Sequence, residues 1–438
     1  MNIRVLVGLL LCSGSIPMFA AEVLGGVSGR YEHSNNILQA QSGEQDEDML
    51  VPRVDMTLVE ESGRVQGSGT LYVERVDYRN DLATDETRYG LTTAWNASII
   101  DNRLTWILED TAGRRLVDSR ELDIAENRFD QNQLVTGPDL TFSAGARDEL
   151  TLSARYGNSW YGDTVSFDNE RYTGRAHIRH QMTPISSIGA HIEHSRTEYL
   201  QDSVVDFDRD EAAIEFSRDL TRSQIRLELG YNRITPEVGE DYDGSLGVVS
   251  WRQQWRRSFF TELRGDWRLT DTGQEAISNA IQGGVDIDLV VSNDIYQLNS
   301  ASFISGWTGS RWSGDLTFRA ETQDYEIQPL DQRIAAVEAG ISREISQQTV
   351  LNVYGDASRT QFLDSNRTDN EFELNARVNH VFSNLFYGAV GTSYGGRNSN
   401  AVNADFRETI VYVEFGLRGT LLARERGREL RRDGQVGY

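Results

Sequence analysis

The residues that could carry chemistry in this chain lie in short, isolated groups. His191 and His194 are three positions apart, and on an extended strand such residues point to opposite faces, so they cannot share a metal ion. Ser195 follows His194 directly, and neighbours on a strand diverge in the same way, which argues against a nucleophile with its base. We therefore expect no enzyme activity, no metal site and no cofactor.

An acidic segment, Asp206-x-Asp208-x-Asp210, begins like a calcium-binding loop. The match then fails, because Glu211 stands where the sharp turn requires glycine and Ser217 where the bidentate glutamate belongs. The segment could still bridge divalent cations to neighbouring lipopolysaccharide, as any acidic loop could.

A larger set of charged residues recurs at every second position of separate stretches of the chain. Arginines and carboxylates are mixed, so neighbouring strands could pair opposite charges, either to hold a wall together or to form a polar track for an acidic or heavily hydroxylated cargo. We predict that these side chains line a pore: Arg171, Arg175, His177, Arg179, Arg226, Glu228, Glu262, Arg264, Asp266, Arg268, Asp315, Arg319, Glu321, Glu373, Arg377, Glu414 and Arg418.

The elements that must position these charges are strands. Ile225, Leu227, Leu229 and Tyr231 alternate with polar or small residues, which is the two-residue period of a strand, and the same rhythm recurs to the C-terminus. A soluble sandwich also alternates. Charged residues in the middle of the polar face favour instead a water-filled barrel with apolar residues on its lipid face.

Short polar turns and longer polar stretches follow one another along the chain, as in outer-membrane barrels. The turns predicted on the periplasmic side are Glu60–Gly63, Asp101–Arg103, Ala146–Glu149, Gln181–Ser186, Asp219–Ser223, Arg256–Ser258, Gly309–Arg311, Ser346–Gln348 and Ser383–Asn384. The longer stretches include Ser34–Asp48, Ala112–Thr136, Gly157–Glu170, Gln201–Arg209 and Asp271–Ser278.

These signals predict an all-β, transmembrane, antiparallel up-and-down β-barrel that forms a single domain over residues 22–420. An opening strand at Val23–His33 and a closing strand at Glu408–Gly419 complete twenty candidates. Gly137–Gly145 and Asp294–Trp307 are weak, so the prediction is about 18–20 strands, enough for an aqueous interior.

The two ends of the chain differ from the middle. Residues 1–21 have the layout of a cleaved signal peptide: Arg4, an apolar run over Val5–Leu11, and Ala20-Ala21 before Glu22. Cys12 lacks the small preceding residue of a lipoprotein signal, so lipidation is the less favoured alternative. Residues 421–438 are rich in arginine, and we expect a basic periplasmic tail, either flexible or helical, or else a docking element.

Composition excludes some functions. The net charge is −24, which disfavours nucleic-acid binding. There is no lysine, so every basic side chain other than histidine is a guanidinium, which stays charged and binds carboxylates in a planar, bidentate way. Cleavage of the signal would remove the single cysteine, so stability must come from a closed ladder of strands and not from disulfides.

The chain resembles one family of outer-membrane barrels. The resemblance rests on the opening segment Gly29-Arg30-Tyr31-Glu32-His33, which runs into Ser34-Asn35-Asn36-Ile37, on Val51-Pro52-Arg53-Val54, and on hairpins at Leu227–Tyr231 and Val350–Asp356. By this pattern the chain is similar to the beta-barrel porin 2 family, which is associated with PEP-CTERM and exosortase exopolysaccharide loci. One departure is that the last strand aromatic, Phe415, is followed by the basic tail.

The resemblance implies an outer-membrane channel that conducts secreted exopolysaccharide. Its expected partners are outer-membrane lipid and lipopolysaccharide, polysaccharide or small polar solutes, and periplasmic export proteins. Two alternatives stay open: a general or solute-specific diffusion porin, which inward-folded long loops would favour, and a non-conducting structural or adhesion barrel, which a plugged interior would favour.

Overall fold

The computed structural model describes residues 22–61, 63–116, 120–122, 127–162, 167–201, 204–271 and 294–422. The predicted signal peptide and residues 423–438 of the predicted tail lie outside these ranges. The strands are β1 (Glu22–Ser34), β2 (Glu47–Glu60), β3 (Val65–Tyr78), β4 (Glu86–Ile100), β5 (Leu104–Leu116), β6 (Arg128–Ala144), β7 (Asp148–Tyr161), β8 (Asn169–Thr183), β9 (Ser186–Tyr199), β10 (Phe207–Asp219), β11 (Ser223–Pro236), β12 (Tyr242–Arg256), β13 (Phe259–Asp271), β14 (Ile295–Thr308), β15 (Trp312–Tyr325), β16 (Gln332–Ser346), β17 (Thr349–Phe362), β18 (Arg367–Val381), β19 (Phe386–Ser399) and β20 (Phe406–Leu422).

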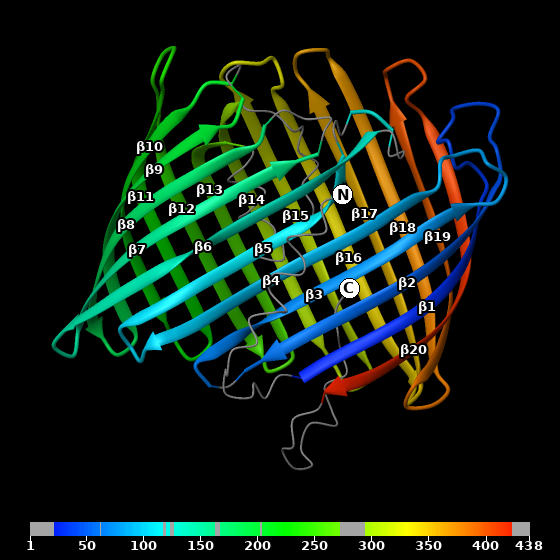
Figure 1. Cartoon of the computed structure of the whole chain (residues 1–438), viewed down its shortest axis with the longest axis horizontal. Helices are drawn as coiled ribbons and strands as arrows, with labels where there is room; N and C mark the ends of the chain where they lie inside the picture. Colours follow the sequence, from blue (N-terminus) through cyan, green and yellow to red (C-terminus); the bar gives the residue numbers. More distant parts are fainter. Residues whose placement is uncertain are drawn as a thin grey trace.

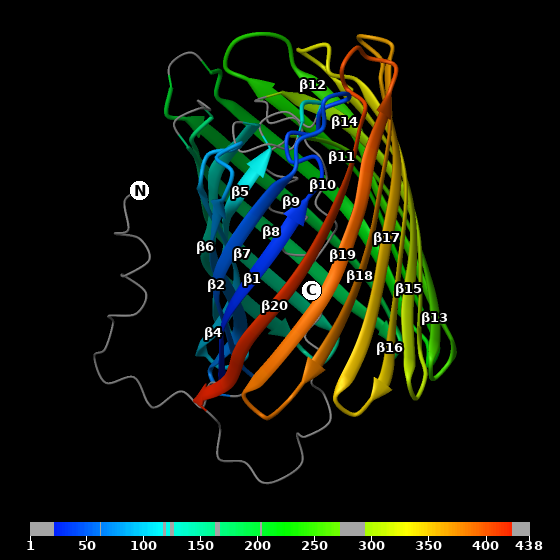
Figure 2. The same cartoon turned by 90° about the vertical axis from the view of Figure 1, so that its right-hand side faces the viewer.

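Each strand pairs antiparallel with its neighbours in the chain, and β1 pairs with β20 from Val23–Leu422 to Ser34–Ile410. This last pairing closes a single 20-stranded barrel, with β1 and β20 side by side at the seam (Figures 1 and 2). The predicted all-β, up-and-down barrel of a single domain is therefore confirmed. The two weak candidates are real strands, β6 and β14.

Each of the nine predicted short turns joins an even-numbered strand to the next strand in the chain, from β2–β3 to β18–β19. The longer connections lie together at the other end of the barrel (Figure 1). The prediction was wrong about how far the strands extend toward that end. The stretch expected as a loop over Ala112–Thr136 is strand up to Leu116 and again from Arg128.

A further boundary differs in the same way. Pairing continues in β7 to Tyr161, within the stretch expected as a loop over Gly157–Glu170. In these extensions polar residues replace the alternation while the backbone ladder continues. Hydrophobic periodicity therefore does not predict a strand in such a segment.

The outward face of the barrel is apolar. Leu227, Leu229 and Tyr231 are 37%, 51% and 50% exposed, and Ile192 and Ile214 exceed 60%. Side chains of this kind are stable in that position only when lipid covers them, so the outer surface is that of a membrane-spanning barrel. No helix among the described residues is long and apolar enough to cross a membrane.

Aromatic rings lie over glycines on adjacent strands. Gly247 of β12 is paired with Trp267 of β13, and a Cβ at Gly247 would come within 1.9 Å of the Trp267 ring. The same arrangement joins three further cross-strand pairs: Gly90 with Tyr72, Gly391 with Tyr412 and Gly416 with Tyr387. The glycine leaves the space that the ring fills, so each pair adds contact area across the ladder.

Candidate functional site: the barrel interior

The residues predicted to line a pore share one face of the sheet. Cross-strand partners face the same side, and following them round the barrel connects the predicted residues of β8, β11, β13, β15, β18 and β20 without a change of face. That face is the inner one, because its side chains reach strands that are not neighbours. Arg377 of β18 lies 3.2 Å from Glu414 of β20.

Opposite charges pair along this wall. Arg175 lies 3.2 Å from Glu215 and 3.9 Å from Glu193, Arg252 lies 3.1 Å from Glu262, and Arg268 lies 3.2 Å from Asp266. Other predicted residues remain without an ion pair to the described residues: Arg179, Arg226, Glu228, Asp315 and Arg319. The wall thus contains both charges that bind each other and charges available to a solute.

The outer end of β13 leaves the wall and turns inward. Pairing between β12 and β13 stops at Gly247–Trp267, whereas β13 stays paired with β14 as far as Asp271–Ile295. Gly244 of β12 faces the interior, and a Cβ there would come within 3.0 Å of Gln297 Oε1 and 3.5 Å of Leu269 Cβ. The bare backbone at Gly244 therefore makes room for the inward-turned hairpin.

This hairpin is anchored on a distant part of the wall. Leu269 and Ile295 pack against Phe207 of β10 and Ile234 of β11, and all four are almost completely buried. Asn232 Nδ2 donates a 2.5 Å hydrogen bond to the Leu269 carbonyl. By register, Phe207 and Ile234 lie on the inner face, so the hairpin packs inside the barrel.

One ion pair completes the anchor. Arg171 of β8 donates from Nη2 to Asp271 Oδ1 at 2.7 Å, and β8 and β13 are five strands apart in the barrel. Asp271 is 2% exposed, and the Arg171 guanidinium also lies 5.9 Å from the Phe207 ring centre. Because both charges are withdrawn from water, each depends on the other.

A second connection reaches the opposite wall. The Arg120 carbonyl, between β5 and β6, accepts hydrogen bonds from Arg367 Nη2 at 2.6 Å and Arg397 Nη1 at 3.1 Å, and the Glu121 carbonyl accepts one from Arg397 at 3.2 Å. Arg367 and Arg397 belong to β18 and β19 and are themselves held by Asp369. The described ends of β13 and β14, and residues 120–121 between β5 and β6, therefore reach into the interior at the long-loop end, each fixed to a different part of the wall.

Beside the β13–β14 hairpin, carboxylates gather outside the membrane-spanning segments. Asp294 is fully buried and accepts hydrogen bonds from the backbone N–H groups of Ile295, Ile327 and Gln328 at 2.7, 3.1 and 2.6 Å. Burial raises the pKa of Asp294 above its ordinary value, and burial together with Asp294, Asp324 and Asp331 raises the pKa of Glu326. The connection after β15 is thus tied to the hairpin through a carboxylate.

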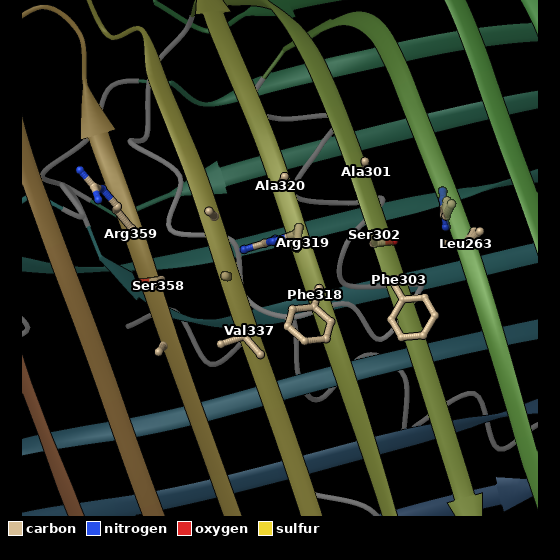
Figure 3. Close-up of a pocket in the computed structure, with 14 residues that line it drawn as sticks. Leu263, Ala301, Ser302, Phe303, Phe318, Arg319, Ala320, Val337, Ser358 and Arg359 are labelled. Carbon is tan, nitrogen blue, oxygen red and sulfur yellow. The ribbon is translucent and has the colours of Figure 1, made fainter.

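A recess of about 660 Å³ lies on the other side of the wall. Phe303, Phe318 and Val337 lie side by side in it on consecutive strands (Figure 3). They face away from Arg319 and toward lipid, and Phe318 is 48% exposed. This recess belongs to the membrane-facing surface and not to the barrel interior.

Sequence reasoning missed several interior residues. The alternation of β10 could have identified Glu211 and Glu215, because Ile214 between them occupies a lipid-facing position and the odd-numbered residues therefore face inward. No sequence signal could have identified Asp271, Arg397 or the Arg120 carbonyl, because their partners come from distant strands.

A closed 20-stranded barrel with an apolar outer face and a charged inner face is a transmembrane β-barrel of the outer-membrane type. No family profile and no curated protein sequence matches the chain, so membership of the family that the sequence resembles remains a prediction. Solved structures with a similar arrangement are known at low identity. The unliganded ferric citrate transporter FecA is 10% identical, with 93% of this chain and 79% of that chain covered and a TM-score of 0.44.

Two further structures are similar at comparably low identity. The siderophore receptor PiuA from Acinetobacter baumannii is 7% identical over 90% of this chain and 81% of that chain, with a TM-score of 0.45. OccK2 (OpdF) from Pseudomonas aeruginosa is 11% identical over 92% of this chain and 98% of that chain, with a TM-score of 0.37.

Proposed function

We propose that this protein is an outer-membrane channel through which small polar solutes diffuse along a charged inner wall. The observation that carries the proposal is the inward position of the β13–β14 hairpin ends, held by Arg171–Asp271, and of residues 120–121, held by Arg397 on another part of the wall. A barrel of about 16–18 strands or more encloses an aqueous channel, and segments folded into it reduce its cross-section. This is the geometry that favours the diffusion-porin alternative.

Charge supports a polar cargo. Arg226, Arg319 and other guanidiniums of the wall have no ion pair with the described residues, while Asp315 and Glu228 supply carboxylates. Many weak contacts of both signs let a hydroxylated or charged solute exchange its hydration for wall contacts without being trapped. Passage of a secreted exopolysaccharide, which the sequence resemblance implies, needs a wide path through the same narrowed end.

The two cargoes can be separated by reconstituting the folded protein in liposomes. Swelling rates with a graded series of neutral sugars and sugar acids are expected to fall steeply with solute size, and planar bilayers should show discrete conductance steps. A folded barrel that conducts no ions would favour the non-conducting structural alternative. Entry of long acidic polysaccharide with no size limit would favour export.

A further inference from the structure

A histidine is enclosed by carboxylates on the inner face of β9 to β11. The His191 side chain is completely buried, and both ring nitrogens meet a carboxylate: Nδ1 lies 2.7 Å from Glu215 Oε1, and Nε2 lies 3.1 Å from Glu211 Oε1. Glu228 completes the group, since one possible ligand atom from each of His191, Glu211 and Glu228 lies within 4.8 Å of the others.

The strand register places like charges opposite each other at this point. Glu215 of β10 is the direct partner of Glu228 of β11, and Glu211 of β10 is the direct partner of Glu193 of β9. Like charges at such positions destabilise a sheet unless a positive charge lies between them. The arrangement is thus suited to a cation.

In the described part of the chain, the positive side chains nearby pair with Glu211 and Glu215 but not with Glu228. Arg209 Nη2 binds Glu211 Oε2 at 2.7 Å, and Arg175 Nη2 lies 3.2 Å from Glu215 and 2.9 Å from His191 Nδ1. His177 Nε2 lies 3.4 Å from Glu215. Glu228 has neither a hydrogen bond nor an ion pair with the described residues.

We propose that His191 Nε2 and one carboxylate oxygen each from Glu211 and Glu228 bind a divalent transition-metal ion, with Zn²⁺ as the expected occupant. Imidazole with carboxylates is a donor set that Zn²⁺ accepts, and bonds of about 2.0–2.2 Å place adjacent tetrahedral ligands roughly 3.3 Å apart. The Nε2–Oε1 distance of 3.1 Å already matches this spacing, and Glu228 needs only a side-chain rotation to approach.

The surroundings orient the ligands. With the metal on Nε2, His191 Nδ1 is protonated and donates to Glu215, so Arg175 Nη2 donates to Glu215 and not to Nδ1. The Glu215 contact fixes the ring orientation and increases the basicity of the ligand. Arg209 holds the second oxygen of Glu211. His191 is buried, but Glu228 is only partly buried on the inner face, so the ion can enter from the aqueous interior past Glu228, and a water molecule can take the fourth position. The proposal concerns binding alone and does not depend on the cargo of the channel.

The test is Zn²⁺ binding to folded, chelator-treated protein in detergent, measured by calorimetry with Co²⁺ absorption as a spectroscopic check. We expect one Zn²⁺ per chain, with affinity weakened by at least about tenfold in His191→Gln and in Glu228→Gln. Glu338→Gln is the matched control, because Glu338 also faces inward opposite a carboxylate, Asp356, but has no histidine partner, and it should leave binding unchanged.

Heat-modifiable gel migration confirms that each variant is folded. Glu228→Gln keeps the proposal falsifiable if His191→Gln fails to fold, because Glu228 makes no contact that holds the wall. Absence of saturable binding, or equal binding in folded Glu228→Gln and the unsubstituted protein, would overturn the site even if the barrel conducts as proposed.

Discussion

Arg171 and Asp271 form an ion pair in which each charge is buried against the other. Replacing Arg171 with alanine leaves Asp271 without its guanidinium, and removing one partner of a buried pair costs about 3–5 kcal/mol. We expect the substitution to release the hairpin end from the wall while the barrel itself stays folded. Arg171→Ala should therefore raise single-channel conductance and relax the solute size limit.

The control for this prediction lies on the same strand. Arg179 faces the same interior nearer the short-turn end and has no ion pair with the described residues. Arg179→Ala should keep the size limit of the unsubstituted channel. An unchanged size limit in Arg171→Ala, Asp271→Ala and the double variant would show that the hairpin does not restrict the path.

Glu326 gives a second prediction at the residue scale. Its pKa is raised, so the folded state disfavours the ionised form. Its contribution to stability is therefore complete below the ordinary glutamate pKa of about 4.3 and is lost as pH rises through the raised value. Glu326→Gln stays neutral, so it should stabilise the fold by a few tenths of a kcal/mol near pH 8 and have no effect near pH 4.

The measurement is the temperature of the gel-mobility transition at both pH values. Glu44→Gln, in the exposed connection after β1, should shift neither. A gain for Glu326→Gln that was equal at both pH values would contradict an origin in ionisation.

Among strands, the aromatic and glycine pairs determine how closely neighbours approach. Gly247→Val would place a branched side chain where the Trp267 ring lies, and overpacking of this kind costs about 1–3 kcal/mol. We expect a lower temperature for the gel-mobility transition and an altered Trp fluorescence spectrum. Gly174→Val is the control, because a Cβ at Gly174 meets nothing within 4 Å. An equal decrease of the transition temperature in both variants would instead attribute the effect to the lost backbone flexibility of glycine.

The strands themselves were predictable because lipid imposes a two-residue period, which is why β11 and β13 could be read from Ile225–Tyr231 and Leu263–Leu269. The extensions of β5 and β6 were not, since polar residues replace the two-residue alternation there. The inner face of β8 followed from the same alternation. The contact between Arg171 and Asp271 did not, because it depends on where a hairpin bends 100 positions further along the chain.

The whole molecule should behave as a closed barrel with no free edge at membrane depth. Every strand has two partners, and β1 with β20 supplies the last ladder. We expect unheated protein in SDS to migrate ahead of boiled protein, and Val27→Pro, which removes a backbone donor at the seam, to reduce the unheated fraction. A soluble product whose migration is insensitive to heat would contradict the membrane barrel.

The parting of β12 and β13 at Gly247–Trp267 also limits where the bilayer can lie. Above that point, β12 residues 242–246 have no β13 partner, and backbone groups left open in hydrocarbon cost several kcal/mol each. The hydrocarbon boundary must therefore run at or below Trp267, which leaves nine residues of β13 from Phe259 upward, close to the 9–11 that a tilted strand needs. The end of the β12–β13 pairing thus determines how deeply the barrel sits in the bilayer. Trp267 lies at the upper interface and the half-exposed Trp255 at the lower one.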